Sequence, residues 1–334
     1  MAFKMSQKRK LAGWLVLATA LWLLWGCAHH QPLPDETRHW VYQADGGGPA
    51  MVQRWAPAFV AYGHAERFNR IGRPTVRLTS DGDQTVYVDP EEPVIYYMER
   101  AFSTEKASYT NLIYRVHFPE VPFSLIPFNL TAGKNVGLLV VVTLDSRKRP
   151  VLVTTVHTCG CYKAIVPTEY LPRGDYPVHW KAEPLDIYGE RLPSILNFEG
   201  IPTPRIIVYL RPGVHRVMDL KVRDAGDLVA EPFRTVPMKF DTMEQLERLP
   251  VDDGTTSFYY DEGLLKGHVK GSVKPWETLL MSLFSLDLFV GTDKAYADNA
   301  RTGNPFYTSL KPWRRQDSNM WDFSRFLHYW GWRL

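Results

Sequence analysis

Two nearly uninterrupted apolar runs, separated by a short polar loop, constrain the fold more than any other feature of this chain. The runs are GLLVVVTLD at 137–145 and PVLVTTVHT at 150–158, and the loop is 146–149. Their length and their β-branched residues are typical of strands. Because apolar and polar residues do not alternate in either run, both faces of each strand should be buried. The sequence therefore predicts a hairpin at the centre of a sheet that is covered on both sides.

Further strands are predicted before and after this hairpin. Each is a short β-rich run, and most adjoin a glycine or proline turn. They lie at 73–89, with a turn at Asp81-Gly82, at 112–118, and in a hairpin of 205–210 with 215–222. Residues 54–69 differ, because Trp55, Phe59 and Tyr62 have the spacing of a short amphipathic helix. Residues 51–240 are therefore expected to form a β-rich domain, an antiparallel sandwich or an open barrel with a flanking helix.

Helical signals replace strand signals after residue 240. The sequence Asp241-Thr-Met-Glu244 resembles a capping box and predicts a helix that ends at Pro250. Residues 275–291 begin with a proline and end with a glycine. They are too short, and too interrupted by Asp287, to span a bilayer, so they predict a buried helix.

The last predicted helix begins near Ser318. Its apolar face carries Phe323, Phe326, Leu327 and Trp330, and we expect that face to dock onto the body of the protein rather than onto a membrane. Residues 241–334 are thus expected to form a helical, aromatic-rich C-terminal subdomain. The predicted fold class is α+β.

The first residues of the chain resemble the export signal of a bacterial lipoprotein. Basic residues precede an apolar run at 11–26, and Leu24-Trp25-Gly26-Cys27 is similar to a lipobox. The resemblance covers residues 1–27 only. It implies cleavage before Cys27, whose thiol carries a diacylglycerol with fatty acyl chains such as palmitate. A retained transmembrane anchor is the alternative, but a helix of this length spans only about 24 Å of a core of roughly 30 Å.

This resemblance also implies a location in the bacterial cell envelope. Ala28 follows the cysteine, which favours the outer membrane, facing the periplasm. Residues 27–50 are rich in proline, glycine and polar side chains and are expected to form a flexible tether. Removal of the signal leaves 35 basic against 36 acidic residues, a net charge of −1, so the expected partners are the membrane and an envelope protein rather than nucleic acid.

The one short motif that suggests chemistry is His157-Thr-Cys159-Gly-Cys161, at the end of the second long run. Imidazole and thiolate both ligate zinc or copper, and Gly160 permits the bend that would let the three side chains converge on one ion. A fourth ligand could come from His117, His179 or Glu120. The spacing does not choose among these three.

Two other interpretations of the cysteines stay open. A Cys-x-Cys disulfide closes a tight ring and is expected to be reducible, which suggests redox activity. It is also consistent with an inert bridge that forms because export exposes thiols to an oxidising compartment. With Cys27 lipidated, Cys159 and Cys161 are the only cysteines left in the mature chain.

No motif for a hydrolase or for phosphate binding names a reaction. The leading functional hypothesis is therefore a membrane-anchored envelope lipoprotein with a binding or structural role. The alternative is a metal- or thiol-dependent enzyme centred on His157, Cys159 and Cys161.

Overall fold

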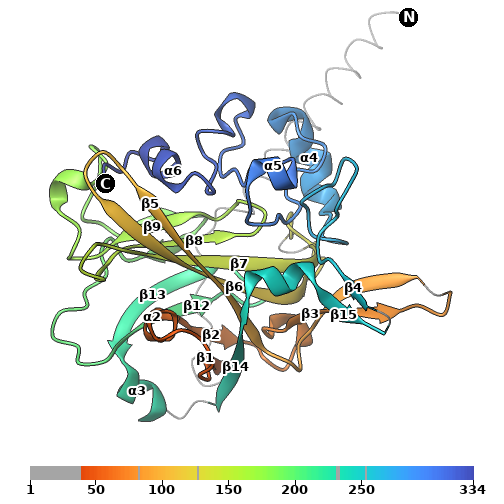
Figure 1. The fold of residues 1–334 in the computed structure, drawn as a ribbon, viewed down its shortest axis with the longest axis horizontal. Coiled ribbons are helices and arrows are strands. Elements are labelled where there is room, and N and C mark those ends of the chain that lie inside the picture. Colours follow the sequence, from red (N-terminus) through yellow and green to blue (C-terminus); the bar gives the residue numbers. More distant parts are fainter. Residues whose placement is uncertain (1–38, 82, 126–127, 231–233, 253) are drawn as a thin grey trace, which may run out of the picture.

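The computed structural model describes residues 39–334, apart from 82, 126–127, 231–233 and 253. A large sheet curls into a half-barrel at its centre, with short helices on both sides (Figure 1). The strands of this sheet are β1 (His39–Ala44), β2 (Ala58–Tyr62), β5 (Val94–Ser103), β6 (Ser108–Val121), β7 (Gly133–Leu144), β8 (Pro150–His157), β9 (Ala164–Pro167), β12 (Pro204–Leu210), β13 (Val217–Asp224) and β14 (Arg234–Thr242). The predicted α+β class is confirmed.

The remaining elements are short. Three two-stranded ribbons pair β3 (Arg73–Leu78) with β4 (Gln84–Asp89), β10 (Leu185–Ile187) with β11 (Glu190–Leu192), and β15 (Leu249–Val251) with β16 (Gly254–Thr256). The helices are α2 (Ala50–Trp55), α3 (Ala225–Ala230), α4 (Pro275–Ser285), α5 (Asn299–Thr302) and α6 (Phe323–Tyr329). Single 3₁₀ turns are η1 (Arg67–Asn69), η2 (Arg173–Asp175), η3 (Met243–Glu247) and η4 (Pro312–Arg314).

The sheet is mixed rather than antiparallel throughout. Its strand order is β13-β12-β2-β1-β14-β5-β6-β7-β8-β9. The pairs β12–β2, β1–β14 and β14–β5 are parallel, and the other neighbours are antiparallel. The predicted hairpins β3–β4, β7–β8 and β12–β13 all form. The hairpin β7–β8 is interior, but it lies near the β9 edge rather than at the middle of the sheet.

The strand β7 is buried on both faces because successive side chains enter two different cores. Leu138, Val140 and Val142 face a core that also contains α2 and β12. Leu139 and Val141 face a second core that lies between the sheet and the C-terminal segment. Figure 1 shows α4, α5 and α6 on one side of the sheet and α2 on the other. The continuous apolar run is therefore explained by two-sided burial.

Two predictions for the N-terminal part are wrong. Residues 54–69 do not form one helix: α2 ends before Pro57, and residues 58–62 form β2, whose five residues are all buried between β1 and β12. Pairing on both edges overrides the helical spacing. Residues 39–44, expected to be part of the tether, form β1 between β2 and β14. The rest of the predicted tether before His39, like Cys27, lies outside the described residues.

The C-terminal part is less helical than its sequence pattern suggests. The segment after Asp241 forms only the 3₁₀ turn η3, without a side-chain cap, and then enters β15. The helix α4 begins at Pro275 as expected, but it ends at Ser285 because Leu286 adopts a left-handed conformation, with φ of 51°. Most of this segment packs on the sheet and shares its second core, so it is not a separate helical unit.

The prediction that 275–291 forms a buried helix is wrong in an informative way. Leu283 and Phe284 are 78% and 76% exposed, whereas the polar Glu277 and Ser285 are only 7% and 0% exposed. The helix α4 therefore turns its polar side chains toward the protein and its apolar ones outward.

The helix α6 docks as predicted. Phe323, Phe326 and Leu327 are buried in the second core, and Trp330 is half-buried against it. The side chain of Asp322 caps the helix by accepting a hydrogen bond from the Arg325 backbone N–H at 3.3 Å.

Replacing Phe326 by alanine should lower the free energy of unfolding by about 3–5 kcal/mol, because it leaves a cavity in a fully buried site. Urea denaturation of the mature chain measures this change. His328→Ala, at an exposed position on the same helix, is the matched control and should change stability little. A loss below about 1 kcal/mol for Phe326→Ala would show that the face is not docked.

Candidate functional site

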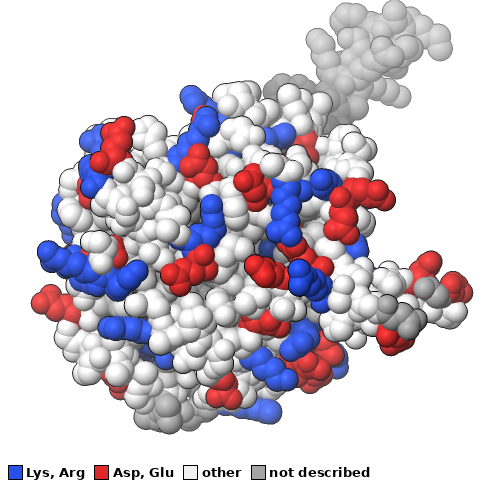
Figure 2. Space-filling model, in the orientation of Figure 1, with Lys and Arg blue, Asp and Glu red and all other residues white. Residues whose placement is uncertain are grey.

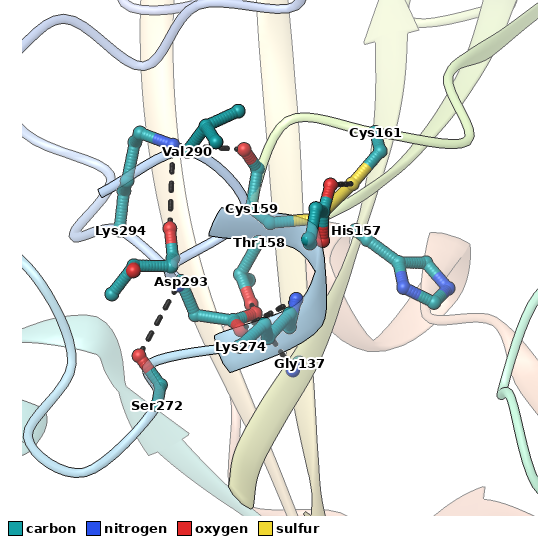
Figure 3. Close-up of a disulfide and its surroundings, with 12 residues drawn as sticks. Gly137, His157, Thr158, Cys159, Cys161, Ser272, Lys274, Val290, Asp293 and Lys294 are labelled. Carbon is teal, nitrogen blue, oxygen red and sulfur yellow. Dashed lines mark hydrogen bonds and ion pairs between the residues drawn. A yellow bond between two sulfur atoms is a disulfide. The ribbon is translucent and has the colours of Figure 1, made fainter. Parts of the chain in front are cut away.

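The candidate site is the loop that follows β8, where Cys159 and Cys161 form a disulfide (Figure 3). The chain reverses sharply here: the Gly160 N–H donates to the His157 carbonyl at 2.7 Å, and the His157 N–H donates to the Cys161 carbonyl at 3.0 Å. Gly160 has φ of +95°, and a Cβ atom at this position would meet the Tyr307 carbonyl oxygen at 2.1 Å. Both the backbone conformation and the close packing therefore require glycine.

His157 does not join the cysteines in a common site. Its imidazole Nε2 donates to the His215 carbonyl at 3.1 Å, and its ring lies edge-on to Tyr162. Figure 3 shows the ring on the far side of the disulfide from Asp293 and Lys294. Burial lowers the pKa of His157 to about 3, with a further contribution from Lys274, so the imidazole is neutral.

The three suggested additional ligands are also engaged elsewhere. His117 is buried in β6 and accepts a hydrogen bond from Arg115 Nε at 2.9 Å. Glu120 lies farther along β6, where it is paired in register with Lys134. His179 is exposed in the loop between η2 and β10.

The arrangement of these residues does not suit a metal. Over the described ranges, no three or more His, Cys, Asp or Glu side chains are placed to hold an ion. Both sulfur atoms are bonded to each other, and a disulfide sulfur lacks the thiolate charge that zinc or copper prefers. The structure therefore brings together the two cysteines of the predicted site without its histidine.

A buried carboxyl group replaces the expected imidazole beside the disulfide. Glu277, in the first turn of α4, places Oε1 3.8 Å from Cys161 Sγ. Its other oxygen, Oε2, is buried and has no hydrogen-bond partner among the described residues. Gly291 makes room for this side chain, since a Cβ atom there would meet Oε2 at 2.3 Å. Burial raises the pKa of Glu277, against the opposing effects of Lys274 and Lys294, which favours the neutral acid.

Two buried lysines, Lys274 and Lys294, bind neighbouring segments near the Glu277 carboxyl group. Lys274 and Asp293, both 1% exposed, form an ion pair at 3.0 Å. Asp293 also accepts hydrogen bonds from the Thr158 hydroxyl and from the Gly137 N–H. Lys294 Nζ donates to the Cys159 carbonyl at 2.9 Å, and burial lowers its pKa to about 8. These contacts connect the disulfide loop to both ends of the α4 segment (Figure 3).

A cavity of about 200 Å³ opens beside the disulfide. Its wall is largely apolar and aromatic, and includes Cys159, Cys161, Tyr162, Glu277, Met281 and Tyr307. Cys159 is 3% exposed, whereas Cys161 is only partly buried. A reactant in the cavity would therefore reach Cys161 before Cys159.

Sequence reasoning missed Glu277, Lys274, Asp293 and Lys294. The available signal was charge in or beside an apolar stretch, because a charged side chain in a buried segment needs a partner. Sequence reasoning noted a charge in an apolar stretch only for Asp287, as a residue that interrupts the run at 275–291. It did not indicate which charged residues would meet the cysteine loop, more than 100 positions earlier in the chain.

The buried histidines should make the protein sensitive to acid. Between its ordinary value of 6.5 and its folded pKa of about 3, His157 binds a proton in the unfolded chain but not in the folded one. The contribution of neutral, buried His157 to the free energy of unfolding is therefore fully present above pH 6.5. It decreases as the pH falls, and about 2 kcal/mol is lost at pH 5. Urea denaturation measures the free energy of unfolding at pH 7 and at pH 5. Between these two pH values it should fall by about 2 kcal/mol less in His157→Gln than in the unmodified chain. Equal losses would contradict the prediction.

Comparison with known proteins adds no relative to this description. No protein-family model matches the chain, and no curated protein or solved structure is similar to it. Within the described ranges, each helix is too short or too polar to cross a membrane.

Proposed function

We propose that this chain is a bacterial envelope lipoprotein with a binding or structural role, anchored through Cys27 to the periplasmic face of the outer membrane. The support from the sequence is the basic start, the apolar run at 11–26 and the lipobox-like Leu24-Trp25-Gly26-Cys27. The support from the folded domain is the outward apolar face of α4. This face is the structural observation that chiefly supports the binding role, whereas the anchor rests on residues 1–27.

The α4 surface is a contiguous set of exposed apolar side chains. It consists of Trp276, Leu279, Leu280, Leu283, Phe284, Leu286 and Leu288. Phe123 continues it, because its ring stacks on Trp276 with centroids 5.8 Å apart. Leu279, Leu283, Phe284, Leu286 and Leu288 are each at least 69% exposed. A contiguous apolar surface of this kind marks a contact with a partner or a lipid.

The surroundings of the α4 surface favour a lipid. The segment 310–315 lies against the end of the helix, because Arg315 bonds to the Ser285 carbonyl and lies 3.6 Å from Asp287. It adds an exposed tryptophan, Trp313, and two exposed basic side chains, Lys311 and Arg314, of which Arg314 is paired with Asp317 at 3.0 Å. Apolar residues with adjacent tryptophan and basic side chains are typical of helices that lie in the membrane interface.

The length of the N-terminal stretch and the distribution of charge confine the proposed lipid contact to the region around α4. The stretch from Cys27 to His39 reaches about 40 Å at most, so a lipidated cysteine would keep the domain close to the bilayer. On the face drawn in Figure 2, basic and acidic side chains are interspersed. The α4 surface and its few flanking basic side chains, and not a broad basic face, would therefore make the contact with lipid.

The anchor can be tested directly by mass spectrometry of the protein extracted from membranes. We expect a mature N-terminus at Cys27 that carries acyl mass. Cys27→Ser should abolish both the acyl mass and the cleavage before residue 27. An intact N-terminus in the unmodified protein would overturn the lipoprotein assignment.

The α4 surface can be tested separately with a chain that begins at Ala28 and has no lipid. This chain should bind vesicles of mixed neutral and anionic phospholipid, and Leu283→Ser with Phe284→Ser should weaken binding at least about tenfold, since each side chain contributes up to roughly 1.5–3 kcal/mol when fully buried. The melting temperature should change little, because both positions are exposed.

Leu264→Ser is the matched control for vesicle binding. Leu264 is 80% exposed and lies outside the α4 surface, so its replacement should leave binding unchanged. Failure of the unlipidated chain to bind any of the vesicles would exclude the lipid contact while leaving the Cys27 anchor untouched.

A further inference from the structure

We propose that the Cys159–Cys161 disulfide is a thiol–disulfide exchange centre, in which Glu277 supplies the proton to the departing Cys161 sulfur. This activity goes beyond membrane attachment, and it stands whether or not Cys27 is lipidated. The substrate class is a protein or small molecule that carries a pair of thiols.

The two sulfur atoms differ in their access to the cavity. Cys161 is partly exposed in the wall of the cavity, whereas Cys159 is 3% exposed. A thiolate that enters the cavity therefore meets Cys161 Sγ first. The largely apolar wall fits a client whose cysteines lie among apolar residues.

The Cys159–Cys161 bridge adds little to the stability of the fold. A disulfide stabilises a fold mainly by closing a loop in the unfolded chain, and the effect decreases with loop length. Here the separation is two residues, and the turn is already held by Gly160 and by backbone hydrogen bonds. Stability alone is therefore a poor explanation for two cysteines at this position.

Glu277 lies beside the disulfide without the partners that a buried acid usually has. A buried acid normally has hydrogen-bond partners, since an unsatisfied polar atom is costly. Glu277 instead directs Oε1 to within 3.8 Å of Cys161 Sγ, and its Oε2 has no partner within the described part of the chain. The acid is therefore held beside a reactive sulfur without being used to stabilise its surroundings.

The exchange proceeds through a mixed disulfide. A client thiolate attacks Cys161 Sγ; a client–Cys161 bond forms, the Cys159–Cys161 bond breaks, and the electron pair goes to the Cys159 sulfur, which takes a proton from solvent. The second client thiolate then attacks the client sulfur. The client disulfide forms, the bond to Cys161 breaks, and the Cys161 sulfur takes the electron pair together with the proton of Glu277.

The overall reaction is balanced. The client dithiol loses two electrons and two protons and becomes a disulfide, and Cys159 and Cys161 become thiols. Glu277 regains a proton from solvent. Exchange with a disulfide-bearing partner, run in the reverse direction, restores the oxidised pair.

The charges around Glu277 suit this role. Lys274 and Lys294 each lower the pKa of Glu277, which favours release of its proton, and Asp293 is paired with Lys274 at 3.0 Å. The two cations favour the sulfur anions that form during exchange. They belong to the segments on either side of α4, so the helix holds the acid and the cations together.

Attack on Cys161 can be tested with reduced glutathione and the native mature chain. Mixed disulfide, trapped by acid and mapped by peptide mass spectrometry, should form on Cys161 without denaturant. In the chain that begins at Ala28, which lacks Cys27, each of the variants Cys159→Ser and Cys161→Ser keeps a single cysteine. With oxidised glutathione, Cys159→Ser, which keeps Cys161, should react at least about tenfold faster than Cys161→Ser. Melting temperatures of both variants show that they are folded. A disulfide that reacts only after denaturant is added is an inert bridge and overturns the proposal.

Proton donation is tested in the Cys159→Ser background, starting from the mixed disulfide of Cys161 with glutathione. Dithiothreitol should release Cys161 about tenfold or more slowly in Glu277→Gln, while Glu262→Gln, a matched change at an exposed glutamate, should have no effect. The rate of Cys161 release should also be measured against pH and divided by the concentration of dithiothreitol thiolate. With Glu277 present, this corrected rate should decrease as the pH rises through the pKa of the acid. In Glu277→Gln it should not change with pH. An unchanged rate and pH profile in Glu277→Gln would overturn the role of Glu277.

Discussion

Burial of β7 and β8 on both faces is the constraint on which the rest of the structure depends. A strand with apolar residues at every position cannot leave one face in water, so two separate layers have to cover it. The curled sheet with α2 supplies one layer, and the segment after residue 243 supplies the other. This second layer is largely irregular and contributes few regular elements of its own. It is held by aromatic side chains such as Phe258, Phe306 and Phe326, which fill the second core.

This arrangement brings the cysteine loop and the C-terminal segment together. The loop follows β8 directly, and the segment that covers the sheet passes over the end of that strand. Lys294 bonds to the Thr158 and Cys159 carbonyls, through its backbone N–H and Nζ respectively, and Asp293 bonds to the Thr158 hydroxyl. A buried charge requires a partner, and Lys274 and Asp293 provide one for each other. These polar contacts fix the ends of α4 and thereby direct Glu277 inward.

The same contacts explain why α4 exposes its apolar face. Glu277 and Ser285 occupy the face of α4 that is turned toward the protein, so the leucines and the phenylalanine of the helix point outward. The two proposed sites consequently lie on opposite faces of one helix: a lipid contact outside and a thiol-exchange centre inside. Met281, which lines the cavity from α4, lies between the two. A domain held at the membrane by this helix would carry its disulfide close to the lipid surface.

The sequence by itself determined the strands whose signal is local: the hairpins around 82, 146–149 and 212–213, the two-sided burial of β7 and β8, and the docking face of α6. It also located the cysteine motif and the bend that Gly160 permits. Only the tertiary structure decided that residues 58–62 are a strand, because pairing with β1 and β12 outweighs the helical spacing. It likewise decided that the apolar face of α4 is exposed, and that Glu277 rather than His157 lies beside the disulfide. Contacts between residues 157–161 and 274–294 depend on how a distant segment packs, and no local pattern encodes that geometry.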